Sequence, residues 1–201
     1  MHREQTGVLE RTDEQLIAAF QGGELQAFNL LVGRYKDQLV NFAFRFLGDY
    51  DAADEVAQET FIRVYRKKQS YKPVAKFSTW IYTITTNLAK SELRRRKRHF
   101  LFSLSRRRTE GDEGDDRDFE IPDERNPTDA QASGVLQAEI IQEALDSLPA
   151  AYREVVVLRF VQEMSYEEIC EITHMNMGTV KSRLNRARQR LQDLLKDVAN
   201  E

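Results

Sequence analysis

The residues from Glu110 to Glu124 constrain the fold more than any other part of the sequence. This stretch is acidic, contains two glycines and a proline, has almost no apolar residues, and shows neither a helical nor an alternating period. A segment of this composition buries too little apolar surface to fold by itself. The sequence therefore predicts two domains, at 12–97 and 135–198, joined by a flexible acidic linker at 98–134.

Length and composition allow two small domains and exclude several classes of protein. The chain has 201 residues, of which 41% are hydrophobic and 31% charged, so each half can form a modest core. The single cysteine cannot form an intramolecular disulfide, and no Cys/His cluster has metal-ligand spacing, so we expect no metal and no cofactor. We also find no signal peptide and no run approaching the ~18 apolar residues of a membrane-spanning helix. These features predict a cytoplasmic protein without membrane insertion.

Charge is distributed unevenly along the chain, although the formal net charge is only -3. Basic residues exceed acidic ones in 12–97 and again in 172–201, whereas acidic residues dominate 98–134 and 135–171. Local fields, rather than the net charge, steer charged partners toward a protein. Two basic segments therefore stand out, one in each predicted domain.

The first domain has the apolar periodicity of four helices, which predicts an all-α bundle. A capping box at Thr12 starts a short helix, and apolar residues at three- and four-residue steps mark a second helix over 28–46, which Gly48 ends. Asp51 is placed to cap a third helix, and a fourth runs over 77–98 into a cluster of arginines. The polar face of the third helix is unusually acidic and consists of Asp54, Glu55, Gln58 and Glu59.

Basic and aromatic side chains meet in the loop at 69–76 and at the start of the fourth helix. Lysines and arginines attract phosphates, and bases removed from a duplex stack on aromatic rings at ~1–3 kcal/mol each. This combination favours single-stranded DNA, with Tyr71, Trp80 and Tyr82 as candidate stacking residues. An alternative stays open for Trp80, because a tryptophan at helical spacing is more often a core residue.

The second domain ends in a predicted helix-turn-helix. An amphipathic helix over 140–148 stops at Pro149, which is also well placed to open the next helix. A capping box at Ser165 then starts a short helix, and Asn176 caps the last helix after a three-residue turn. These two helices and the short turn between them form the helix-turn-helix. The second domain is therefore predicted to be all α-helical, like the first.

The last helix carries a cationic face, and the sequence has no acidic residue from Asn176 through Gln192. Arginine forms bidentate hydrogen bonds to guanine, and Asn or Gln to adenine, while helix N-terminal amides and further arginines hold phosphates. A charged helix face is usually only solvated, but the capped short helix and the turn before it indicate DNA binding in the major groove. The face comprises Lys181, Ser182, Arg183, Asn185, Arg186, Arg188, Gln189 and Arg190.

In their order and spacing these motifs resemble the extracytoplasmic-function (ECF) sigma factors, the small two-domain members of the sigma-70 family of bacterial transcription initiation. The stretch from Ala53 to Phe61 is similar to conserved region 2.2 of that family. The helix from Phe77 onward to Arg95 is similar to regions 2.3 and 2.4, and the segment from Ala144 to Leu191 is similar to region 4. The resemblance covers nearly the whole chain.

The resemblance implies a sigma factor that is not itself an enzyme and that directs core RNA polymerase to promoter DNA. The acidic face at 54–59 would dock on the clamp coiled coil of the β′ subunit of the polymerase. The flap of the β subunit would be a further contact. The resemblance also implies an anti-sigma factor as a partner. The residues implied to bind the minus-10 element are Tyr71, Lys72, Lys76, Trp80, Tyr82, Asn87, Arg94 and Arg95. Those implied to read the minus-35 element are Thr179, Lys181, Ser182, Arg183, Asn185, Arg186 and Arg188.

A few positions depart from the family pattern, and His174 in the helix-turn-helix matters most, because glycine is usual there. If this turn residue needs a positive φ, histidine carries strain that glycine would not. The alternative function is a stand-alone helix-turn-helix regulator with an N-terminal dimerisation domain, which leaves the Trp80 region and the acidic face at 54–59 unexplained. A helical enzyme is not favoured, because the sequence has no phosphate-cradling glycine loop and no histidine at catalytic spacing.

Overall fold

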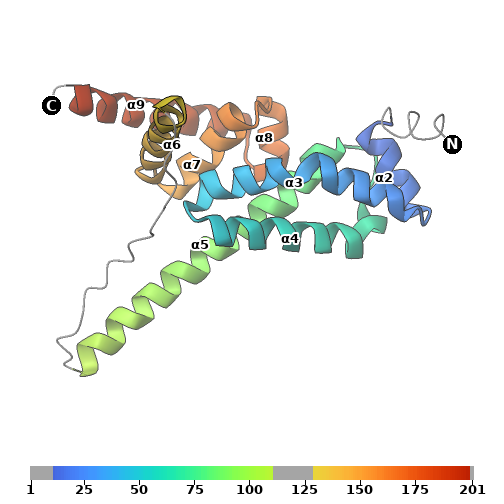
Figure 1. The fold of residues 1–201 in the computed structure, drawn as a ribbon, viewed down its shortest axis with the longest axis horizontal. Coiled ribbons are helices and arrows are strands. Elements are labelled where there is room, and N and C mark those ends of the chain that lie inside the picture. The colour runs from blue at the N-terminus through green and yellow to red at the C-terminus, as the bar shows by residue number, and fades with distance from the viewer. Residues whose placement is uncertain (1–10, 111–128, 200–201) are drawn as a thin grey trace.

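The structure, a computed structural model, describes residues 11–110 and 129–199, and the regular structure within these residues is entirely helical. Figure 1 shows the first four helices as a bundle and the later helices as a second group packed against it. The first domain contains α2 (Asp13–Gln21), α3 (Leu25–Leu47), α4 (Tyr50–Lys67), a 3₁₀ turn (Lys68–Ser70) and α5 (Phe77–Glu110). The second contains α6 (Asp129–Asp146), α7 (Ala150–Val156), a π-helical turn (Val157–Val161), α8 (Tyr166–Thr173) and α9 (Met177–Ala199). The prediction of an all-α fold is confirmed.

Capping residues next to each helix determine where the first helices begin and end. The capping box predicted at Thr12 is present, and Gly48 ends α3 in the left-handed conformation with a φ of 70°. The prediction that Asp51 caps the third helix is wrong. Asp49 has extended backbone geometry and its Oδ1 accepts a hydrogen bond from the backbone N–H of Ala52 at 2.9 Å, so Asp49 is the cap.

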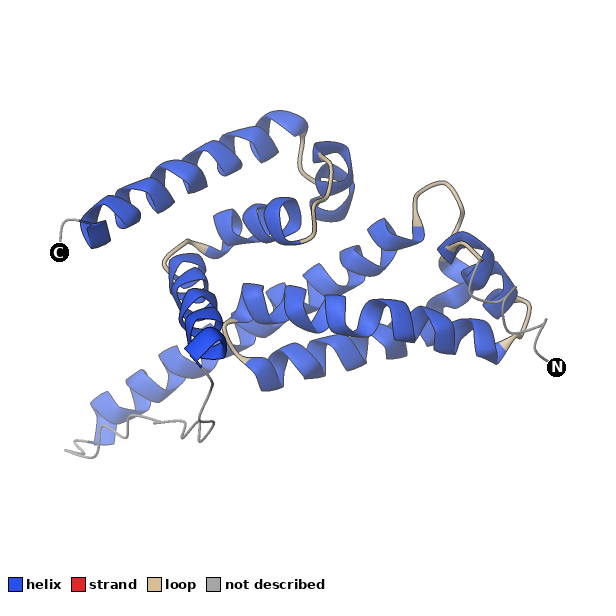
Figure 2. Cartoon of the chain, turned by 45° about the horizontal axis from the view of Figure 1, so that its top comes forward, coloured by secondary structure: helices blue, strands red, loops and turns tan. Residues whose placement is uncertain are grey.

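Helix α5 is longer than the sequence predicted, because it continues past residue 98 to Glu110. Residues 99–108 contain neither glycine nor proline, so no residue in that stretch breaks the helix. Both views show this C-terminal part of α5 projecting away from the bundle (Figures 1 and 2). Helix α6 in turn begins at Asp129, so helical structure enters the predicted linker from both sides, and residues 111–128 lie outside the described residues.

The core connects the two domains. One cluster of buried side chains includes Leu39 and Ile81 of the first domain together with Val155, Leu158 and Ile169 of the second. Helix α5 packs against α8, and α3 packs against the turn that follows α7. The two domains are therefore in direct contact in this structure. In the part of the chain that the structure describes, we find no helix with the length and apolar content that a membrane span requires.

Candidate nucleic-acid interface

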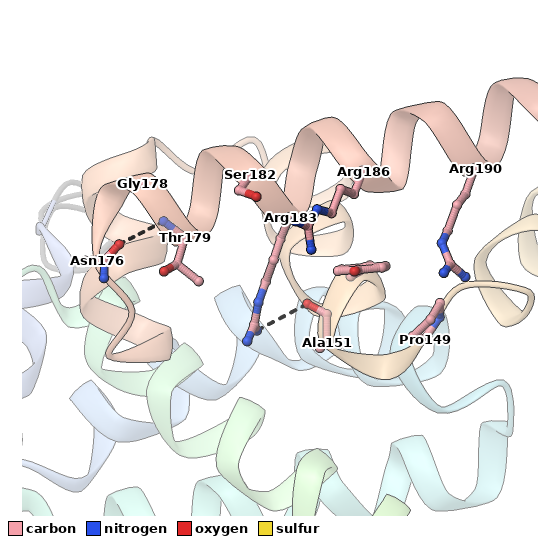
Figure 3. Close-up of a pocket in the computed structure, with 10 residues that line it drawn as sticks. Pro149, Ala151, Asn176, Gly178, Thr179, Ser182, Arg183, Arg186 and Arg190 are labelled. Atoms are coloured by element: carbon pink, nitrogen blue, oxygen red, sulfur yellow. Dashed lines mark hydrogen bonds between the residues drawn. The ribbon is translucent and has the colours of Figure 1, made fainter.

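The helix-turn-helix is built by reciprocal caps. The N–H of Glu168 donates to Ser165 Oγ at 3.1 Å while the N–H of Ser165 donates to Glu168 Oε2 at 2.9 Å, so α8 starts with the predicted capping box. Asn176 Oδ1 accepts a hydrogen bond from the N–H of Thr179 at 2.8 Å and caps α9 (Figure 3). Between them His174 has a φ of 56° and a ψ of 29°, which is the left-handed conformation. The turn therefore does place histidine where glycine is less strained.

A groove of about 600 Å³ lies between α9 and the start of α7. Arg183 reaches toward α7, where its Nη1 donates to the carbonyl oxygen of Ala151 at 3.4 Å (Figure 3). The guanidinium of Arg190 lies 5.4 Å from the ring centre of Tyr152, a cation–π contact that holds the arginine at the far end of the groove. The residues that line the groove are Pro149, Ala151, Tyr152, Asn176, Gly178, Thr179, Ser182, Arg183, Arg186 and Arg190.

The predicted minus-35 residues divide between the two flanks of α9. Thr179, Ser182, Arg183 and Arg186 line the groove beside α7, whereas Lys181, Asn185 and Arg188 line a smaller hollow of about 140 Å³ beside Phe160 and Tyr166. Val180, Leu184 and Ala187 are buried beneath them, so the helix presents its polar side outward. A helix with cationic groups on both flanks can contact the phosphates on both sides of a groove while its centre faces the base edges.

In the first domain, the side chain of Tyr71 packs inward in the loop between the 3₁₀ turn and α5, where it is buried. Its hydroxyl donates to the carbonyl oxygen of Ala75 at 2.9 Å, and its ring centre lies 5.3 Å from that of Trp80. Only 5% of Tyr71 is exposed, and burial raises the pKa of its hydroxyl. Lys72 and Val74 occupy the exposed tip of the loop instead, and Trp80 is half-buried.

Tyr82 is also buried, with 2% of its surface exposed. Its ring packs edge-on against Phe42 at 5.4 Å, and its hydroxyl donates a hydrogen bond to Oε1 of Gln162 in the second domain. Burial raises the pKa of Tyr82 as well. The structure therefore does not place Tyr71 and Tyr82 as exposed stacking platforms, because both rings complete hydrophobic contacts.

Acidic partners neutralise two of the predicted minus-10 cations. Lys76 Nζ lies 2.9 Å from Glu168 Oε1, and this pair raises the pKa of Lys76 and lowers that of Glu168. Arg95 Nε lies 2.7 Å from Glu92 Oε2, which holds the pKa of that carboxyl below its ordinary value. The predicted residues that remain exposed without such a carboxylate contact are Lys72, Asn87 and Arg94.

The acidic face of α4 lies on the outer side of the bundle, as its helical period predicts. Glu55 and Gln58 are exposed and Asp54 and Glu59 are half-buried. The Gln58 amide donates to Asp54 Oδ2 at 2.7 Å, and Arg63 Nε lies 2.8 Å from Glu59 Oε1. The outer side of α4 thus carries carboxylates at 54, 55 and 59, and the Glu59 carboxylate is already paired with Arg63.

An ion pair between the domains was missed at the level of sequence. Lys90 Nζ of α5 lies 2.5 Å from Oε1 of Glu154 in α7, and only 2% of Glu154 is exposed. Burial raises the pKa of Glu154, and Lys90 opposes that shift. The two residues are far apart in the chain, and neither belongs to a local motif, so no sequence signal could have joined them.

Comparison with known proteins matches both domains. The model of Sigma-70 region 2 matches residues 31–99, and the model of Sigma-70 region 4 matches residues 138–191. The ECF RNA polymerase sigma factor SigW of Bacillus subtilis (strain 168) is 36% identical over 191 residues, which cover 94% of this chain and 100% of SigW.

Two solved structures share the fold over most of the chain. CnrH in complex with the cytosolic domain of CnrY has a TM-score of 0.68 at 23% identity and covers 92% of this chain and 97% of its own. The sigma factor RpoE in complex with the anti-sigma factor NepR from Bartonella quintana has a TM-score of 0.62 at 28% identity and covers 84% of this chain and 96% of its own. The arrangement of helices described above is thus one that solved structures also contain.

Proposed function

The chain belongs to the ECF RNA polymerase sigma factors, and we propose that its two domains divide promoter recognition between α5 and α9. It directs transcription initiation by RNA polymerase. The observation that carries the proposed division is that a cationic helix lies within each of the two segments that match sigma-70 regions. A stand-alone helix-turn-helix regulator is not favoured, because region 2 accounts for residues 31–99.

Helix α9 would read the minus-35 element in the major groove. The exposed Arg186 and Asn185 are suited to base edges, since arginine pairs with guanine and asparagine with adenine. Lys181, Arg183 and Arg188 on the flanks would hold phosphates, and Thr179 and Ser182 near the start of the helix would add short polar contacts.

The loop before α5, together with α5 itself, would bind the minus-10 element as a single strand. Lys72 and Lys76 would contact phosphates, Trp80 would stack on a base, and Asn87, Arg94 and Arg95 would extend the contact along the helix. Tyr71 and Tyr82 would take part after the contacts that bury their rings have been released. The polymerase would supply the chemistry of RNA synthesis, in the bacterial cytoplasm.

The outer face of α4 would dock on the clamp coiled coil of the β′ subunit through Asp54, Glu55, Gln58 and Glu59. The flap of the β subunit is proposed as a contact of the second domain. An anti-sigma factor is proposed as a regulatory partner, with support from the RpoE structure, which is a complex with such a factor. Acidic side chains on a rigid helix are suited to steer a basic partner into register.

The test of polymerase docking is charge reversal on α4. Asp54→Lys combined with Glu59→Lys should abolish promoter-specific transcription by core polymerase and should leave binding to a duplex minus-35 site intact. The matched control is Asp37→Lys, an exposed acidic position on α3 outside the proposed face, which should keep full transcription. Unchanged transcription by the double variant would refute the docking assignment.

A further inference from the structure

Helix α2 contacts the 3₁₀ turn in which the loop at 69–76 begins, and it also contacts α5, which follows the loop. Gln21, the last residue of α2, spans the turn. Its Nε2 donates hydrogen bonds to the carbonyl oxygens of Lys68 at 2.7 Å and of Tyr71 at 3.0 Å. The turn comprises Lys68–Ser70, so these carbonyls lie at its start and directly after its end. One half-buried amide therefore fixes the backbone where the chain leaves α4 and enters the loop.

The turn also donates hydrogen bonds back to the end of α2. Lys68 Nζ donates to the carbonyl oxygen of Phe20 at 2.9 Å and lies 4.1 Å from the centre of the Phe20 ring. Gln69 Nε2 donates to the carbonyl oxygen of Gln21 at 3.0 Å. Carbonyl groups in the last turn of a helix lack intrahelical partners and carry partial negative charge, so a lysine and an amide are suited to them. The end of α2 and the start of the loop thus satisfy each other's polar groups.

The first turn of α2 holds the other end of the loop. Glu14 Oε1 accepts a hydrogen bond at 3.1 Å from the backbone N–H of Phe77, the first residue of α5. The N–H groups at the start of a helix have no intrahelical acceptor, and the helix dipole favours a negative charge beside them. The neighbouring Asp13 accepts from the Tyr35 hydroxyl at 2.5 Å and from Arg34 Nη1 at 2.6 Å, which fixes α2 on α3. The loop is therefore anchored to one helix at both ends.

The tip of the loop, between these anchors, faces outward. Lys72, Pro73 and Val74 are exposed, and 92% of Val74 is accessible. The N–H of Val74 donates to the carbonyl oxygen of Lys72 at 2.7 Å, so the tip is a tight turn. Ordering a backbone costs conformational entropy, and in this loop that entropy is lost on folding and not on DNA binding. Both anchors act on the backbone, so they are compatible with contacts between the side chains and DNA and with release of the Tyr71 ring.

We propose that α2 positions the loop at 69–76: Gln21 and Glu14 hold its two ends in the conformation that binds a single strand, and neither residue contacts DNA. This inference rests on the proposed function, which assigns the loop and α5 to the minus-10 element. If a loosened loop adopts the binding conformation about a tenth of the time, its apparent affinity falls about tenfold. A loop that adapts to any strand also places no fixed group against a given base, so the preference for one sequence should fall with the affinity.

Two substitutions of Glu14 isolate its hydrogen bond, because both remove the negative charge. Glu14→Gln keeps an oxygen that can accept from the N–H of Phe77, whereas Glu14→Ala does not. Loss of a carboxylate near the loop should by itself strengthen binding to DNA. Glu14→Ala should nonetheless bind a single strand about tenfold more weakly than Glu14→Gln, which should keep at least the wild-type affinity.

The substitution Gln21→Met tests the other anchor. Methionine has about the length of glutamine but has no donor for the carbonyl oxygens of Lys68 and Tyr71. The variant should also lose about tenfold in affinity, without any change of charge. The matched control is Gln38→Met, at an exposed glutamine of α3 whose amide donates to the carbonyl oxygen of Arg34 in the same helix at 3.0 Å. This control should bind as the wild type does.

The probe is a labelled single strand that the full-length wild-type protein selects from a randomised pool, and a scrambled strand of the same composition measures the sequence preference. Trp80, the only tryptophan in the sequence, reports on the loop without DNA, since its ring centre lies 5.3 Å from that of Tyr71. Acrylamide should quench Trp80 fluorescence more strongly in Glu14→Ala and Gln21→Met than in the two controls. Urea unfolding curves establish that every variant is folded in the binding buffer, so a general loss of stability does not enter the comparison.

The outcomes distinguish this inference from the proposed function. Weaker and less selective binding together with stronger quenching supports the positioning role of α2. Unchanged quenching, or stronger quenching with the affinity and preference of the wild type, would overturn it. A wild-type protein with no preference among single strands would instead overturn the minus-10 assignment, and the quenching comparison would still report whether α2 holds the loop.

Discussion

Replacing His174 by glycine should stabilise the protein. The residue is exposed and has a φ of 56°, a conformation that costs a residue with a Cβ about 1–2 kcal/mol. Glycine avoids this strain but loses about 0.5–1 kcal/mol more backbone entropy on folding. The difference predicts that His174→Gly gains about 0.5–1 kcal/mol of unfolding free energy. For a chain of this length that corresponds to a rise in Tm of roughly 1–4 °C.

Thermal and urea unfolding of three variants test this reasoning. His174→Ala removes the imidazole but keeps a Cβ at positive φ, so it should show no comparable gain. Glu171→Gly, at an exposed position inside α8, should lose about 1 kcal/mol, because glycine is unfavourable in a helix interior. A His174→Gly protein that is no more stable than His174→Ala would show that the left-handed turn is not strained.

Three other substitutions have effects that the structure predicts. Asn176→Ala removes the cap that accepts from the N–H of Thr179 and should cost about 1 kcal/mol in urea unfolding, with Asn176→Ser close to wild type. Burial raises the pKa of Glu154, so the folded state binds a proton on this carboxylate more tightly than the unfolded state does. The wild type should therefore gain unfolding free energy relative to Glu154→Gln as the pH falls from neutral through the raised pKa. A difference in unfolding free energy between the two proteins that does not change with pH would contradict the raised pKa. Arg186→Ala should lose about 1–3 kcal/mol of discrimination at one base pair of the minus-35 site in competition binding, whereas a uniform loss across sequences would mark a phosphate contact.

Local signals in the sequence were sufficient for most helix boundaries. The capping boxes at Thr12 and Ser165 and the cap at Asn176 depend on residues three positions apart, and all three are present. The cap of α4 was misplaced, because Asp49 and Asp51 offer the same side chain two residues apart. The choice depends on backbone geometry, since Asp49 is extended directly after the left-handed Gly48.

The periodicity of single helices also predicted which face each candidate site occupies. It correctly placed the carboxylates of α4 and the arginines of α9 on outer surfaces. It could not predict the burial of Tyr82, because that residue is covered by contacts with Phe42 and Gln162 from other elements. Contacts between distant segments depend on how helices pack, and a pattern within one helix carries no information about its neighbours.

The proposed function is that this sigma factor brings core RNA polymerase to promoters that carry two recognition elements. Transcription of a fragmented bacterial genomic library by core polymerase, with and without the protein, tests this proposal when every new RNA start is mapped. New starts preceded by two sequence blocks at fixed spacing are the expected result. Absence of new starts, from protein that still binds duplex DNA by itself, would overturn the proposed function and favour a stand-alone regulator.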